Sequence, residues 1–325
     1  MPRNALPRTG AAQAPGPVAD QAPASSAPRA RSRRPRPRRT GGLWAFALPA
    51  IGLYALLTIY PLIKAIPLSL TDSTGGPSSA GVGLANYRAM WDDDAVRSAV
   101  THTLIFTAVV VVVQNAIGLA LAAMLRRWGR YGKALAVVLL TPALLSAVMA
   151  AFIWSALYTS DGPVNTLLRA VGLGGFAQVW LGNPATALYA IAAVNIWMYV
   201  GFSAAIFQAG FRTIPSDLLE AARLDGANRW QQFRRIEWPL LAPSLTVAVT
   251  LSLTSCMRVL DLPLVMTNGG PDNSTNTLGF QIYTTIFGNG KVGYGTAISV
   301  LLLVMVVVLA VSINALLRRR EGRIG

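Results

Sequence analysis

Sulfur and imidazole ligands are nearly absent from this sequence, which has one cysteine and one histidine among its 325 residues. A single cysteine, Cys256, excludes an intrachain disulfide. A single histidine, His102, excludes a metal site built from clustered histidines. We therefore expect this chain to bind no metal.

Charged side chains are also scarce, at 13% of the residues, whereas a soluble domain typically has about 25%. Hydrophobic residues account for 53%. This balance excludes an ordinary soluble domain and favours a membrane protein.

Motifs of nucleotide binding and catalysis are missing as well. The segment 288–293 matches the spacing GxGxxG, but no strand precedes it and no acidic partner follows it. No phosphate-binding loop, HExxH, nucleophile elbow or cysteine pair occurs. We predict that the chain is not an enzyme and that it binds no ATP itself.

The first 42 residues form a segment of different composition. They contain nine arginines and one acid, Asp20, and are rich in Ala, Pro, Arg and Ser. Such a segment cannot bury a core, so we expect a disordered cytoplasmic tail. The run 31–39 could in principle bind nucleic acid or anionic lipid. We favour a solvated tail that helps to orient the first span, with no nucleic-acid partner.

Six stretches are apolar and long enough to cross a bilayer, which requires about 20 residues in a helix. The sequence therefore predicts an all-α membrane protein with six transmembrane helices. The stretches are residues 43–67, 99–125, 134–158, 186–209, 241–263 and 296–317.

The connections between these stretches differ in their content of Lys and Arg. With the amino terminus inside, the four inner segments hold nine, four, five and four of these residues, or 22 of the 28. Basic residues concentrate on the cytoplasmic side. We therefore predict that both termini are cytoplasmic.

Several polar or aromatic residues occur inside the predicted spans, where they are costly and informative. Gln114 and Asn115 suit hydrogen bonds between helices, and Arg258 and Asp261 can pair along one helix. Spans four and five offer aromatic, amide and hydroxyl groups at helical spacing, a mixture that suits a sugar and equally suits ordinary packing. These residues are Asn195, Tyr199, Phe202, Ser252, Cys256 and Val259.

The longest well-formed polar segment is residues 214–243, between the fourth and fifth spans on the inner side. Ser216 or Asp217 can cap a helix, and with Asp217 as cap Glu220 takes the capping-box position. Gly226 terminates that helix. A second helical piece is expected to stop ahead of Pro239. Two short helices with a glycine hinge predict a rigid docking element for a cytosolic partner.

This segment resembles the EAA loop of ATP-binding-cassette (ABC) importer permeases. The pattern reads Glu220-Ala221-Ala222, Gly226 and then Ile236-Glu237-Trp238-Pro239, with Trp238 where the pattern has Leu. Asp225 and Ala227 fit the fuller form EAAxxDGA.

The resemblance covers most of residues 43–320 and is greatest to the first permease of the pair in carbohydrate-uptake systems, the class of the maltose and glycerol-3-phosphate importers. Unlike the maltose member, this chain has no large external insertion. The segments that carry this likeness are 86–87, 162–165, 195–197, 214–215 and 267–271.

The resemblance implies a type I ABC importer permease fold in residues 43–320, in the plasma membrane of a prokaryote. It implies a second homologous permease, two cytosolic ATPases that carry ATP and Mg, and an extracytoplasmic binding protein that delivers a sugar. The six span residues named above would line the substrate pathway. The residues that couple the chain to an ATPase would be Glu220, Ala221, Ala222, Asp225, Gly226, Ala227 and Pro239.

Two alternatives stay open at this point. A secondary sugar carrier or channel would work without an ATPase, but the six spans show no internal repeat, which such a carrier often has. An ABC importer of an amino acid, peptide or metal is disfavoured by the segments 267–271 and 195–197. Which sugar is moved depends mainly on the binding protein.

Overall fold

The computed structural model describes residues 41–76 and 79–321, and the regular structure of these residues is helical apart from one isolated bridge between Thr71 and Gly81. Of the predicted tail 1–42, residues 1–40 lie outside the described residues. Gly41 and Gly42 begin helix α1.

The chain divides into two compact units, residues 1–53 and 54–325. The described part of the first unit belongs to helix α1 (Gly41–Tyr54). The second unit begins with the π-helical turn η1 (Ala55–Ile59) and helix α2 (Tyr60–Leu68). All further features described below lie in the second unit.

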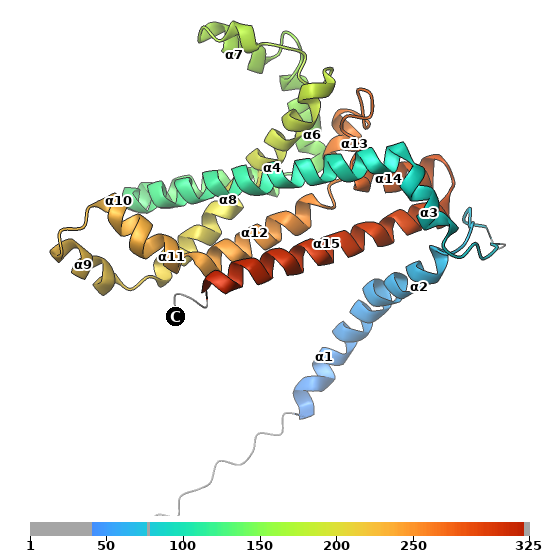
Figure 1. Ribbon diagram of the computed structural model, residues 1–325. Coiled ribbons are helices and arrows are strands. Elements are labelled where there is room, and N and C mark those ends of the chain that lie inside the picture. The colour runs from blue at the N-terminus through green and yellow to red at the C-terminus, as the bar shows by residue number, and fades with distance from the viewer. Residues whose placement is uncertain (1–40, 77–78, 322–325) are drawn as a thin grey trace, which may run out of the picture. The chain divides into compact units, whose positions relative to one another are not determined.

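Four helices of the second unit run side by side, as Figure 1 shows. Helix α4 packs against α8 and α12, and α12 also packs against α8 and α15. These helices are α4 (Asp94–Leu125), α8 (Pro184–Thr213), α12 (Ala242–Cys256) and α15 (Val292–Glu321).

Most of the shorter helices lie near the two ends of these long ones, whereas α7 lies apart from them (Figure 1). Helices α3, α13 and α14 lie where α4 begins, and α10 and α11 lie where it finishes, beyond which α9 extends. Their bounds are α3 (Ala85–Asp92), α7 (Pro163–Ala170), α9 (Ser216–Leu224), α10 (Arg229–Gln232), α11 (Trp238–Leu240), α13 (Asp261–Met266) and α14 (Leu278–Tyr283). Short 3₁₀ and π turns are η2 (Arg126–Trp128), η3 (Thr141–Leu144), η4 (Gly174–Phe176), η5 (Phe233–Glu237) and η6 (Thr284–Gly288).

Helices occupy all six stretches predicted as spans, but two stretches are interrupted. The third consists of α5 (Gly129–Leu140), η3 and α6 (Ala147–Leu157), separated by the extended residues Leu145 and Ser146. Ser146 starts α6 anew, because its Oγ accepts a hydrogen bond from the Met149 N–H. In the fifth stretch, α12 ends at Cys256 and α13 begins at Asp261.

By length and apolar composition, four helical stretches of the described residues qualify as membrane spans, or five if a pair bent by 65° counts as one. One of the four, Asp94–Leu144, has 51 residues. At about 1.5 Å per residue, a straight helix of that length would be far longer than a bilayer core of about 30 Å. The chain instead turns at Gly129, whose φ is +53°, and α5 packs back against α4.

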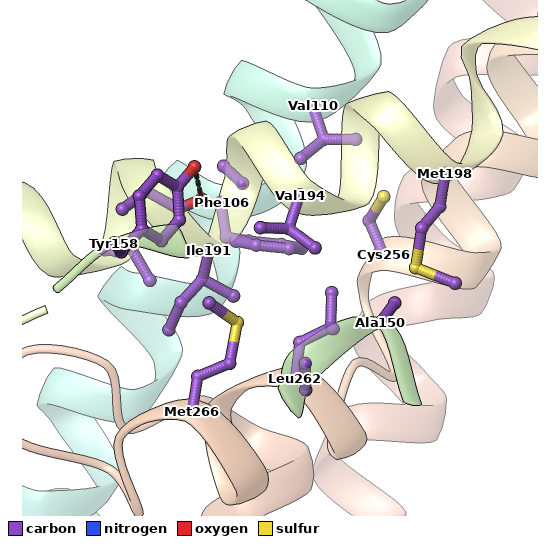
Figure 2. Packing of buried hydrophobic residues seen from close by; sticks show 14 residues of the cluster. Phe106, Val110, Ala150, Tyr158, Ile191, Val194, Met198, Cys256, Leu262 and Met266 are labelled. Carbon is purple, nitrogen blue, oxygen red and sulfur yellow. Dashed lines mark hydrogen bonds between the residues drawn. The ribbon is translucent and has the colours of Figure 1, made fainter. Parts of the chain in front are cut away.

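The largest buried cluster joins α4, α6, α8 and α13 (Figure 2). Phe106 and Val110 of α4 face Ile191 and Val194 of α8 in this cluster. Tyr158 closes one side, and its hydroxyl donates to the Ala190 carbonyl at 3.3 Å. This packing joins one half of α4 to α8 and to the shorter helices α6 and α13.

Small residues bring the long helices very close together. A Cβ placed on Gly118 of α4 would lie 2.7 Å from the Ser203 Cβ of α8, and one on Gly201 would lie 1.9 Å from the Leu139 carbonyl oxygen of α5. Glycine at such crossings is common in membrane helix pairs, where close packing replaces the hydrophobic effect as the driving force.

Candidate functional site

The segment between α8 and α12 contains two short helices, as predicted, although its first cap differs. Helix α9 begins after Pro215, which takes the cap position without a side-chain hydrogen bond. The Ser216 hydroxyl donates to the Asp217 carboxylate at 3.3 Å. The predicted capping box of Asp217 and Glu220 is therefore wrong. Pro215 takes the cap position itself, so Ser216 and Asp217 lie within the first turn of the helix.

Gly226 terminates α9 as predicted. Its φ is +79°, a conformation that glycine adopts without strain. The Ala227 N–H donates to the Ala222 carbonyl at 2.9 Å and the Gly226 N–H to the Arg223 carbonyl at 3.1 Å. These two bonds form a Schellman motif, which fixes the direction in which the chain leaves the helix.

The second helical piece begins with a capping box that sequence reasoning missed. The Asn228 side chain accepts from the Gln231 N–H at 2.9 Å, and the Gln231 side chain accepts from the Asn228 N–H at 2.8 Å. The sequence signal was present, since Asn followed three residues later by Gln is a known start pattern.

The second piece also continues past Pro239, so the predicted stop ahead of that residue is wrong. Pro239 lies in α11 directly after the π turn η5, whose wider turn precedes the proline without ending the helical piece. The rings of Trp230, Phe233 and Trp238 follow one another along this piece, with centroids 5.8 and 6.4 Å apart. The piece then meets α12 at a bend of 65°.

Helix α9 forms no extended packing with another helix of the described residues, and Figure 1 shows it apart from the long helices. Glu220, Ala221, Asp225 and Gly226 are exposed on it or at its end, whereas Ala222 is buried, Ala227 is half-buried and Pro239 is half-buried in α11. Leu218 and Leu224 are 47% and 89% exposed.

An ion pair joins this segment to the end of α4. The Arg126 Nη1 and Nη2 atoms donate to the Glu237 Oε1 and Oε2 atoms at 2.6 and 2.7 Å. Glu237 is 4% exposed, and the guanidinium lies 4.3 Å from the centre of the Phe211 ring of α8. Arg126, which directly follows α4, therefore contacts both α8 and the segment that carries α9 to α11.

Sequence reasoning did not find this pair, because 111 residues separate its members. The available signal was an acid, Glu237, two residues after the basic pair Arg234 and Arg235. Such a buried acid requires a cation from elsewhere in the fold.

A second feature is a cavity of about 360 Å³ between α4, α8 and α12. It is lined by five of the six predicted pathway residues, namely Asn195, Tyr199, Phe202, Ser252 and Cys256. Gln114 of α4, Ser203 of α8 and Ser255 of α12 add polar groups to the lining. The cavity thus combines an aromatic pair with amide and hydroxyl groups.

Hydrogen bonds fix part of this polar lining. Gln114 Nε2 donates to the Ser203 Oγ at 2.8 Å, and Asn115 Nδ2 donates to the Ser252 Oγ at 2.9 Å. These bonds confirm the prediction that the side-chain amides of Gln114 and Asn115 form hydrogen bonds between helices. The Tyr199 hydroxyl has no hydrogen-bond partner among the described residues, so it can bond a solute.

Val259 does not line the cavity. Because α12 ends at Cys256, Val259 lies outside the helix and leaves the face shared by Ser252 and Cys256. Its carbonyl accepts from the Thr277 Oγ1 at 3.0 Å. The expected pair of Arg258 and Asp261 is not among the salt bridges of the described residues, and Arg258 Nε donates to the Thr254 carbonyl.

Comparison with known proteins places these features in a family. Residues 114–324 match the family described as "Binding-protein-dependent transport system inner membrane component". The match includes both the loop and the cavity.

Two curated relatives are similar over most of their length. A probable starch degradation products transport system permease protein, AmyD of Thermoanaerobacterium thermosulfurigenes, is 29% identical over 86% of this chain and 94% of its own. The alpha-glucoside transport system permease protein AglF of Rhizobium meliloti is 32% identical over 81% and 79%.

A solved structure resembles the fold. It is a chain of the bacterial alginate ABC transporter in complex with an alginate pentasaccharide-bound periplasmic protein, with a TM-score of 0.75 and 22% identity over 87% of this chain and 96% of that chain. At this identity the likeness concerns the fold alone.

Proposed function

This chain belongs to the family of binding-protein-dependent transport system inner membrane components, and we infer from that membership that it is the permease subunit of an ABC importer of carbohydrates. It is a multi-pass inner-membrane protein and not an enzyme. The observation that carries the proposal is the exposed helix α9, which ends in the Gly226 Schellman motif and lies within the matched family region.

We propose six membrane spans with both termini cytoplasmic. Support comes from the helices that occupy all six apolar stretches and from the turn at Gly129, which divides the 51-residue stretch in two. The concentration of Lys and Arg in the inner connections supports the placement of both termini on the cytoplasmic side. In this orientation the segment 214–243 faces the cytoplasm.

We propose that α9 inserts into a separate cytosolic ATPase, which holds ATP and Mg. Ala221 and Leu224 supply apolar surface, and Glu220 and Asp225 supply charge. Gly226 fixes the direction in which the chain leaves α9. The buried Ala222 and the half-buried Ala227 and Pro239 keep the element rigid. Movement of the ATPases then shifts the spans between inward-open and outward-open arrangements.

The sugar is proposed to pass along the 360 Å³ cavity. Tyr199 and Phe202 present ring faces to the C–H surface of a sugar ring, and Asn195 and Ser252 present hydrogen-bonding groups to its hydroxyls. Cys256 contributes a small apolar wall. A second, homologous permease would complete the pathway, and an extracytoplasmic binding protein would deliver the solute. Val259 stays a weaker candidate because it lies outside the lining.

Reconstitution tests this function. The chain, its partner permease, two ATPases and the binding protein are placed in proteoliposomes, and uptake of labelled maltose, larger α-glucosides and glycerol-3-phosphate is measured with and without ATP. We expect sugar uptake that requires ATP and the binding protein. Uptake by this chain alone, without any ATPase, would instead establish a secondary carrier or channel.

Two substitutions test the role of α9. We expect Glu220→Ala and Gly226→Pro to abolish ATP-coupled uptake while the protein still inserts into the membrane. Arg234→Ala, an exposed change on the same loop, is the matched control. Normal coupled uptake in both variants would refute the assignment of the loop.

A further inference from the structure

A large cavity lies between the end of α4 and the segment that carries α9 and α10. Its volume is about 1010 Å³. Four arginines line it: Arg126, Arg127, Arg223 and Arg229. Among the described residues of the lining, Glu237 is the one carboxylate.

The charge of this cavity is not balanced by the protein. Glu237 is bound by Arg126, and none of the three salt bridges of the described residues involves Arg127, Arg223 or Arg229. Three guanidinium groups around one hollow repel one another and create a positive potential. Their planar forks match the oxygens of a phosphate group.

The wall on α4 has the opposite character. Ala116, Leu119, Ala120 and Ala123 line it at spacings of three and four residues, so they share one helix face. Three alanines leave a shallow apolar groove on this face. The groove runs from the arginines toward the middle of α4, which is the part that lies in the hydrocarbon region if α4 spans the membrane.

Aromatic side chains mark the same boundary. Trp230, which is 67% exposed, and Phe233 line the cavity beside the arginines. Tryptophan is enriched at the level of lipid headgroups. The basic end of the cavity therefore lies at headgroup depth and the apolar groove lies below it.

We propose that this cavity binds one anionic phospholipid. Arg127, Arg223 and Arg229 hold its phosphate, and an acyl chain follows the groove on α4. A soluble phosphorylated compound would leave the groove unfilled, and a zwitterionic lipid would leave the three arginines unneutralised. The proposal requires only that α4 spans a membrane, so it holds whichever solute is transported.

The test measures lipid retention by native mass spectrometry. The assembled transporter is purified in mild detergent and titrated with palmitoyl-oleoyl phosphatidylglycerol. The pocket variant carries Arg127→Gln, Arg223→Gln and Arg229→Gln. The control carries Arg130→Gln, Arg234→Gln and Arg235→Gln, which are exposed, lie outside the lining and change the net charge equally.

We expect the wild type and the control to retain one tightly bound phosphatidylglycerol. We expect the pocket variant to bind it about tenfold more weakly or worse, because three charge contacts are lost. Equal retention in all three proteins would overturn the proposal, and so would equal loss in both variants, which would indicate diffuse charge attraction.

A second pair of variants keeps the charge unchanged and remains informative if the pocket variant fails to assemble. Ala120→Phe fills the groove, whereas Val112→Phe changes a 67% exposed residue of α4 that does not line the cavity. We expect only Ala120→Phe to lower retention.

Competition distinguishes the remaining occupants. Inorganic phosphate or phosphatidylcholine that displaces the lipid at equal concentration would overturn the assignment to an anionic phospholipid. The permease pair without the ATPases is measured as well. If it retains phosphatidylglycerol and loses this lipid when the ATPases bind, the cavity belongs to the ATPase interface instead.

Discussion

Breaking the ion pair between Arg126 and Glu237 should destabilise the protein by an amount that depends on which partner is removed. Glu237 is buried, with a side chain 5% exposed, whereas the Arg126 side chain is 32% exposed. Arg126→Ala leaves a carboxylate without a cation in a buried position, which costs about 3–5 kcal/mol. It also removes the contact with the Phe211 ring, which contributes about 1 kcal/mol.

Glu237→Ala should cost less. The guanidinium that remains is already partly exposed to water, so it can be hydrated while it keeps its contact with the Phe211 ring. We expect a loss of about 1–2 kcal/mol, the typical contribution of hydrogen bonds to charged groups. The double variant should be more stable than Arg126→Ala alone, because it no longer buries an unpaired carboxylate.

The assay is thermal unfolding of the detergent-purified protein, followed by tryptophan fluorescence and by retention of a monodisperse elution profile. Arg234→Ala is the matched control, since this arginine is exposed, lies three residues before Glu237, lines neither cavity and takes part in none of the salt bridges of the described residues. We expect its effect to stay within about 0.5 kcal/mol. A loss from Glu237→Ala as large as that from Arg126→Ala, or additive losses in the double variant, would refute the reasoning.

Three further substitutions test other parts of the fold. Asn165→Asp should loosen the segment around α7 by about 2–3 kcal/mol, because the Asn165 Nδ2 faces the Thr159 carbonyl at 3.1 Å and that of Gln178 at 2.9 Å; limited proteolysis of this segment measures it, and unchanged protection would contradict it. Gly226→Ala should lower the ratio of uptake to ATP hydrolysis, because a left-handed conformation costs a residue with a Cβ about 1–2 kcal/mol, whereas Gly226→Asn should retain more coupling; equal ratios would contradict it. Gly201→Ala should prevent α8 from packing on α5, since its Cβ would lie 1.9 Å from a carbonyl oxygen; a normal yield of monodisperse protein would exclude this contact.

The sequence predicted the helices well because their positions depend on local composition. Each of the six apolar stretches contains helix, and the loop with Gly226 as terminator follows from turn chemistry that acts over a few residues. The family resemblance then added the prediction that the partner of this loop is an ATPase. These features need no knowledge of contacts between distant parts of the chain.

The interruptions of the third and fifth stretches could not be predicted in the same way. The third stretch is apolar around Leu145, so hydropathy gives no signal there, and in the fifth stretch Arg258 and Asp261 were interpreted as a pair along one continuous helix. The second break is fixed by a distant contact, the hydrogen bond from Thr277 to the Val259 carbonyl, and by Gly279, where a Cβ would lie 2.5 Å from that carbonyl oxygen. The break removes Val259 from the cavity face, which explains why one of the six pathway predictions falls outside the lining.

The same helix, α4, contributes to both candidate sites, and this gives the ion pair a mechanical meaning under the proposed function. Gln114 lines the central cavity and Arg126 binds the loop. The two residues are separated by about 18 Å along the helix axis at about 1.5 Å per residue. Because α9 forms no extended packing with another helix of the described residues, we expect a force on it to reach the spans through the covalent links to α8 and α12 and through Arg126. A rigid helix held at both sites transmits displacement rather than absorbing it.

We therefore expect the loop to move α4 together with α8 and α12. The hydrogen bonds of Gln114 to Ser203 and of Asn115 to Ser252 should then persist while the cavity changes the side of the membrane to which it opens.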